Sequence, residues 1–182
     1  AYSGYIFGLV PELTHPIPGH FLGYDLRRTP AIIENLLADR PPAPPTEPVP
    51  ESYSHAWAYF RERSGLIETH IWQPLNGNAA LNGTAEAIRR LTNNILSALK
   101  LGDLDYIAPN LQWLVGMMSS LNLPADTLCH FLTAYHAATA QHLDATLGQP
   151  VIAWLAKVVA ECRAQSSQEA KGQASVPSEE AR

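Results

Sequence analysis

The chain has little of what covalent frameworks, nucleic-acid surfaces and membrane anchors are made from. It contains 2 cysteines in 182 residues, too few for a disulfide framework, and the two lack the spacing of metal ligands. Both Cys129 and Cys162 fall on apolar helical patterns. We therefore expect them to be buried thiols in a reducing cytoplasm.

Basic residues are scarce as well. The 12 Lys and Arg residues stand against 17 Asp and Glu residues, which gives a formal net charge of −5 at pH 7. A nucleic-acid surface needs clustered positive charge to neutralise phosphates, whereas here only the pairs Arg27-Arg28 and Arg89-Arg90 lie together. We expect no nucleic-acid partner.

Long apolar runs are missing too. No uninterrupted apolar segment approaches the roughly 20 residues that are needed to span a bilayer. The amino terminus also lacks the basic and then apolar regions of a signal peptide. We expect a cytoplasmic protein without a membrane span.

Catalytic motifs are not found in the sequence. The chain contains no Gly-x-Ser-x-Gly elbow and no glycine-rich phosphate loop. The Glu-x-x-His spacing from Glu12 to His15 lies in a proline-punctuated segment, whereas a di-iron carboxylate bundle needs this spacing on two core helices. We expect a non-enzymatic protein with no catalytic residues and no metal site.

What the sequence does contain is a succession of helical patterns with clear ends. Residues 52–72 carry apolar side chains at three- and four-residue spacing, which is typical of one buried helical face. Three long patterns follow from the expected N-cap Thr84, and they end near Gly102, Pro124 and Pro150. A shorter apolar helix comes after Pro150. The pattern predicts an all-α, antiparallel four- to five-helix bundle.

Composition divides the rest of the chain. The beginning is rich in aromatic residues and prolines, which predicts an irregular or extended segment that is too apolar for a solvated tail. The end is polar and predicts disorder. The predicted regions are an extended apolar arm (1–28), a short helix with a proline-rich spacer (29–51, with the helix at 29–39), the helical bundle (52–163) and a disordered tail (164–182).

Three histidines stand six residues apart on the third long pattern, at His130, His136 and His142. A step of six residues turns about 240° around an α-helix, so the three cannot converge on one metal ion. One of them could be an axial ligand of a haem or cobalamin held between helices, beside an aromatic wall and adaptable methionines. The candidate cofactor-binding residues are Trp113, Met117, Met118, His130 and His136.

Two helix junctions carry a family resemblance. The stretch from Ile95 to Asp103 resembles the A-L-x-x-G-D junction of the helical cap module in cobalamin-binding sensory proteins, and Leu121 to Leu128 looks like the next junction of that module. The resemblance covers residues 84–160 and implies a four-helix bundle over one face of cobalamin. The Asp-x-His-x-x-Gly motif of the family's Rossmann-like domain does not occur in this chain. The same rhythm is similar to phycobiliprotein- and globin-type folds.

These observations favour a non-enzymatic function. We expect a regulatory or scaffold protein that acts through protein–protein contacts, either as a homo-oligomer or as a subunit of a larger assembly, because an apolar arm precedes a bundle without catalytic groups. The alternative is a sensor module that binds a tetrapyrrole-like ligand (cobalamin, haem or bilin) within the bundle.

Overall fold

The structure is a computed structural model that describes residues 1–72, 81–107, 111, 114, 116 and 127–173. Within these ranges every named element is helical, which confirms the predicted all-α fold. No helix there combines the length and apolar character needed to cross a membrane. The elements are α1 (Ile6–Leu9), the 3-10 helix η1 (Pro11–Thr14), α2 (Thr29–Asp39), α3 (Glu51–Trp72), α4 (Leu81–Leu101), the 3-10 helix η3 (Leu104–Ile107), α6 (Thr127–His142) and α7 (Gln149–Gln173).

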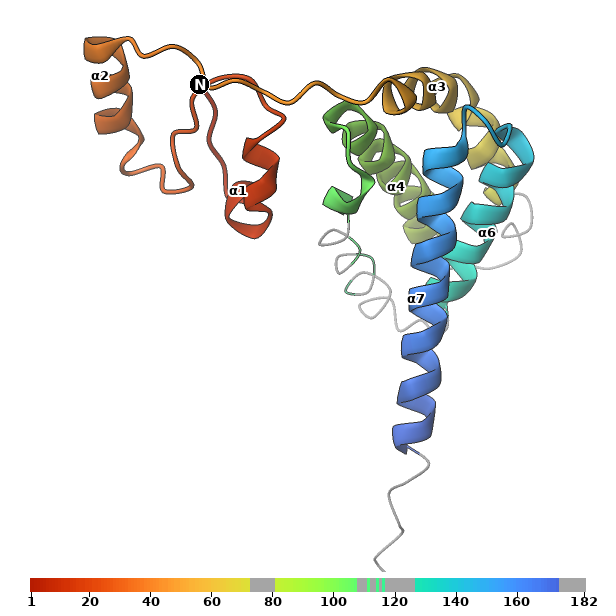
Figure 1. The fold of residues 1–182 in the computed structure, drawn as a ribbon. Helices are drawn as coiled ribbons and strands as arrows, with labels where there is room; N and C mark the ends of the chain where they lie inside the picture. Colours follow the sequence, from red (N-terminus) through yellow and green to blue (C-terminus); the bar gives the residue numbers. More distant parts are fainter. Residues whose placement is uncertain (73–80, 108–110, 112–113, 115, 117–126, 174–182) are drawn as a thin grey trace, which may run out of the picture.

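The helices α3, α4, α6 and α7 surround one core (Figure 1). α3 packs against the other three, and α6 packs against α7. Burying one large apolar side chain stabilises the fold by roughly 1.5–3 kcal/mol, so the shared core holds these helices together. The innermost large side chains are Phe60, Ile67 and Ile71 from α3, Leu91, Ile95 and Leu99 from α4, Leu132 and Tyr135 from α6, and Val151 and Leu155 from α7.

The buried stripe predicted for α3 is confirmed at its apolar positions. Ile67 and Ile71 are 0% and 1% exposed. Trp57, from the same stripe, lies at the edge of the core and is half-buried. The cationic groups of Arg61 and Lys100 lie over its ring, at 4.5 and 4.8 Å from the ring centre. Because Lys100 belongs to α4, the indole joins the two helices at this edge.

The predicted end of α4 is confirmed at Gly102, which has a φ of 84°. Its N–H donates to the carbonyl of Leu99, and the N–H of Asp103 donates to the carbonyl of Ala98. These two bonds form a Schellman motif, for which glycine is the favoured residue. A Cβ at Gly102 would lie 3.1 Å from Cδ of Pro50, so the end of the spacer packs against this turn.

Other boundaries differ from the sequence prediction. α4 begins at Leu81, so Thr84 lies inside the helix and is not its N-cap. α7 continues to Gln173, through the first part of the predicted disordered tail. Ala, Gln, Glu and Lys favour helix, and extending an existing helix avoids the cost of nucleation. The rest of the tail, and most of the second long helical pattern, between Gly102 and Pro124, lie outside the described residues.

The amino-terminal arm, predicted to be irregular or extended, is folded on itself with two short helical segments. The N–H of Tyr2 donates to the carbonyl of His20 (2.9 Å), and the N–H of Leu22 donates to the carbonyl of Tyr2 (2.8 Å). This pairing lets the buried side chains of α1 and η1 form a small second cluster. The cluster consists of Phe7, Val10 and Leu13, with Tyr2, Ile6, Ile17 and Phe21 of the arm and Leu101 and Tyr106 of the bundle packed against it.

One polar chain crosses the bundle core. Tyr135 of α6 is 0% exposed, and its hydroxyl lies 2.7 Å from Oγ1 of Thr92 on α4. The Thr92 hydroxyl donates its own hydrogen to the carbonyl of Ile88 (3.0 Å). Since a threonine hydroxyl has one hydrogen, the Tyr135 hydroxyl must be the donor to Thr92. This chain satisfies a phenol that would be costly to bury alone.

The two hydroxyls predict unequal mutational effects. Thr92→Val removes the acceptor and leaves the buried Tyr135 hydroxyl without a partner, so the free energy of unfolding should fall by about 1–3 kcal/mol. Tyr135→Phe leaves Thr92 bonded to Ile88 and should cost about 0.5–1.5 kcal/mol. In urea denaturation, the double variant should lose less than the sum of the single losses. Strictly additive losses would contradict the bond.

The ionisation of the same phenol should make the free energy of unfolding depend on pH in alkaline solution. Burial raises the pKa of Tyr135, against the opposing effect of its bond to Thr92. An unfolded tyrosine ionises near pH ~10, so above this pH the unfolded state releases a proton that the folded state keeps. The free energy of unfolding should therefore fall more steeply with pH in the wild type than in Tyr135→Phe. Identical slopes for the two proteins would show that the phenol ionises freely in the fold.

Candidate functional site

The predicted cofactor-binding residues are not brought together by the part of the chain that the structure describes. Trp113, Met117 and Met118 lie outside the described residues. His130 is exposed and His136 is half-buried, and both belong to α6. Because their six-residue separation points them in different directions, they cannot approach one ligand atom together. The tetrapyrrole pocket stays a prediction.

The arm and α2 carry an unusual amount of exposed apolar surface. Of the eight large hydrophobic side chains that are exposed among the described residues, six precede residue 40. The remaining two, Leu66 and Leu147, are 50% and 40% exposed on the bundle. Exposed apolar side chains that gather on a surface mark interaction sites, and these six lie in one segment of the chain. We call the six residues the arm surface: Tyr5, Leu9, Tyr24, Leu26, Ile33 and Leu37.

A hollow of about 500 Å³ opens on the arm surface. It lies between α1 and the segment that returns past Phe21, and it is lined mainly by apolar side chains. The rings of Phe21 and Tyr24 form one wall, with their centres 6.3 Å apart. The hydroxyl of Tyr2 donates to the carbonyl of Thr14 (2.8 Å), which holds the two sides of the arm together. The hollow is therefore present before any partner binds.

α2 has no buried residue, although one of its faces is apolar. Ile33 and Leu37 are 39% and 68% exposed. Pro30 lies in the first turn, and the helix ends at Asp39, followed by the C-cap residue Arg40 with a φ of 45°. The helix is 11 residues long, and isolated helices shorter than about 12–15 residues are marginal in water. An apolar face on such a short helix indicates that α2 needs something to pack against.

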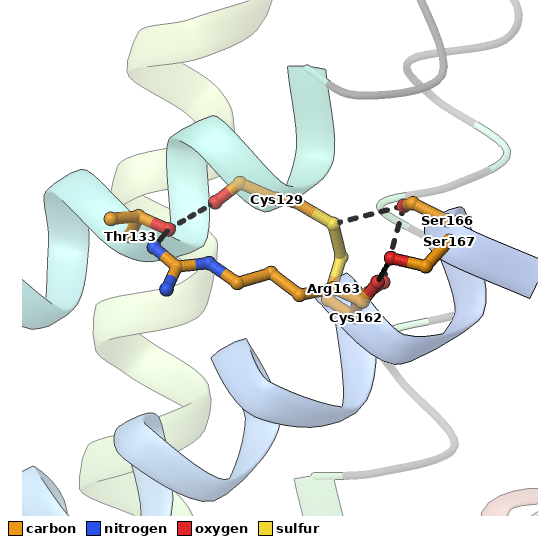
Figure 2. The surroundings of a disulfide bond; sticks show 6 residues. All are labelled: Cys129, Thr133, Cys162, Arg163, Ser166 and Ser167. Carbon is orange, nitrogen blue, oxygen red and sulfur yellow. Dashed lines mark hydrogen bonds between the residues drawn. A yellow bond between two sulfur atoms is a disulfide. The ribbon is translucent and has the colours of Figure 1, made fainter.

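The cysteines form a disulfide and are not the free thiols that we expected. Cys129 of α6 and Cys162 of α7 have Cα atoms 5.7 Å apart (Figure 2). Around them, the Ser166 hydroxyl lies 3.4 Å from Sγ of Cys129, and the guanidinium of Arg163 donates to Oγ1 of Thr133. The bond joins the start of α6 to the middle of α7. The prediction failed because the pairing depends on how two helices pack.

A second contact between helices left no local signal in the sequence. His70 of α3 and His142 of α6 are 72 residues apart, yet their ring nitrogens lie 3.1 Å from each other. The spacing of histidines along α6 gave no indication of this, because the partner belongs to another helix. A helical pattern shows which side a residue faces but not which helix it meets.

Comparisons of the chain with models of protein families, with curated proteins and with solved structures find no match. The resemblance to the cobalamin-binding cap module therefore stays a prediction. Among the described residues, the arm surface holds most of the exposed large apolar side chains.

Loss of the disulfide should destabilise the bundle. The cysteines are 33 residues apart, and a cross-link over a loop of this length stabilises a fold by roughly 3–4 kcal/mol through the unfolded state. Replacing both cysteines (Cys129→Ala with Cys162→Ala) should lower the free energy of unfolding by about this amount in urea. Dithiothreitol should have the same effect on the wild type and none on the double variant. A wild-type protein that is indifferent to the reductant would refute the cross-link.

Proposed function

We propose that the protein is a regulatory or scaffold protein that acts through protein–protein contact, with the arm surface as its docking site. The observation that carries this proposal is α2, a short helix with exposed Ile33 and Leu37 and no buried residue. The bundle is the scaffold that presents it. Chemistry plays no part in this function.

A partner would supply the apolar packing surface that the described part of the chain does not give to α2. Most helical stability in proteins comes from packing an apolar face and not from intrinsic propensity. Fully burying a Leu or Ile side chain contributes roughly 1.5–3 kcal/mol, so covering Ile33 and Leu37 would offset a large part of the cost of ordering the helix. Folding and docking of α2 are thus coupled in this proposal.

The spacer supports the same function because both of its ends are held by contacts with the rest of the chain. At its start, Nε2 of His20 donates to the carbonyl of Pro41 (3.2 Å), which ties the spacer to the arm. At its end, Val49 and Pro50 contact the turn at Gly102. A proline-rich segment favours the extended polyproline conformation of about 3.1 Å per residue, so it acts as a semi-rigid strut. The docking site is presented beside the bundle and does not diffuse freely.

The disulfide bears on where the contact takes place. Disulfides persist in oxidising compartments and are rare in cytosolic proteins, which keep their thiols reduced. The bond between Cys129 and Cys162 therefore favours an oxidising compartment over the cytoplasm that the sequence suggested. The partner in this proposal is a protein of the same compartment or a second copy of the chain.

The proposal predicts that α2 controls association. Replacing Ile33 and Leu37 by Ser should turn an associated full-length protein into a monomer in light scattering coupled to size-exclusion chromatography, because the apolar contact is lost. The matched control is Leu66→Ser, which removes an exposed leucine of the bundle and should change nothing.

Hydrogen exchange of the α2 amides separates the remaining outcomes. A wild-type monomer with slowly exchanging α2 amides would contradict the proposal, because α2 would then be stable without a partner. Fast exchange in a monomer that slows when a partner protein is added would identify that protein as the occupant of the arm surface.

A further inference from the structure

Two imidazole rings meet where α3 and α6 end. His70 lies in the last turn of α3, and His142 is the last residue of α6. Nδ1 of His70 and Nε2 of His142 are 3.1 Å apart, and the rings stand edge to face with an interplanar angle of 78°. Both rings are partly buried and come from helices that pack on each other. The pair is therefore held by the fold and is not an accident of two flexible side chains.

We infer that His70 and His142 form a chelating site for a divalent transition-metal ion of the Zn²⁺ or Cu²⁺ class. A metal–imidazole bond is about 2.0–2.1 Å long, and two such bonds at an angle of about 100° separate their nitrogens by about 3.1 Å. The observed separation is that of neighbouring ligands on one ion. Chelation requires both rings to turn so that their lone pairs point at the ion and no longer at each other.

Protons balance without an additional reactant. In the metal-free pair, one facing nitrogen carries a hydrogen and the other accepts it. Metal binding needs a lone pair on both Nδ1 of His70 and Nε2 of His142. The hydrogen therefore moves to the other nitrogen of its own ring, and two neutral imidazoles release no net proton when the ion binds.

The surroundings specify the kind of ion. The carbonyl ends of α3 and α6 carry partial negative charge, which favours a cation near both residues. Among the described residues no group of three or more His, Cys, Asp or Glu side chains is gathered, so the proposed site has two protein ligands there. Imidazole ligands without carboxylates suit Zn²⁺ and Cu²⁺ and do not suit Mg²⁺ or Ca²⁺. The sequence prediction of no metal site weighed the three histidines of one helix, whereas this pair comes from two helices.

The test uses the full chain with its disulfide intact, in a buffer that does not coordinate metals. Titration with CuCl₂ should show one saturable step with one ion per chain, and the electron paramagnetic resonance spectrum should show coupling to two imidazole nitrogens. ZnCl₂ should compete for the same step and raise the melting temperature. The step should be lost in both His70→Gln and His142→Gln, because an amide can replace the hydrogen bond but not the imidazole ligand. The matched control, His55→Gln, changes an exposed histidine of α3 and should bind as the wild type does.

Two results would overturn the site. One is copper binding that is unchanged in either glutamine variant, and the other is coupling to a single nitrogen. If a variant loses its helical circular dichroism, the wild-type protein still decides. Its His70 and His142 ring resonances should be the first to change in nuclear magnetic resonance spectra as ZnCl₂ is added. Ring resonances of other histidines that shift at lower ZnCl₂ concentrations would exclude the pair.

Discussion

The hydroxyl of Tyr135 needs a hydrogen-bond partner in the middle of the bundle, and this requirement fixes the register of α6. The side chain is fully buried, and Thr92 of α4 accepts its hydrogen bond. With that register set, Cys129 lies about two turns toward one end of α6 and His142 about two turns toward the other. The first is bonded to α7 and the second meets His70 of α3. α6 is thus joined to α4 and α3 by hydrogen bonds between side chains and to α7 by a disulfide.

What could be predicted from the sequence is what depends on neighbouring residues. Apolar spacing identified the buried face of α3, and Gly102 marked the end of α4 because its backbone conformation suits glycine. Contacts between distant residues could not be predicted, since the disulfide and the histidine pair depend on which helices pack together. The arm shows the same limit. Its prolines indicated irregular structure, but the folding of Tyr2 onto Phe21 depends on side-chain packing that local composition does not encode.

The two clusters of buried side chains have different roles: one stabilises the bundle, and the other organises the arm. The large cluster holds α3, α4, α6 and α7 together, whereas the small one around Phe7 organises the arm and reaches the bundle through Leu101 and Tyr106. Most exposed large apolar groups of the described chain belong to the arm surface. In the proposed function, a partner covers this surface and orders α2 without disturbing the main core. Association can change in this arrangement while the bundle keeps its fold.

The place where α7 leaves the bundle has a mechanical consequence. The last turns of α7 extend past the other described helices (Figure 1), and Ala164, Gln165 and Ser167 are exposed. If only noncovalent contacts joined the helices, a force on these turns could separate α7 from the bundle one turn at a time. The disulfide would stop this separation at Cys162 and transmit the force to α6. Because the disulfide couples the two helices at this point, a force applied to the last turns of α7 would reach α6 through a covalent bond.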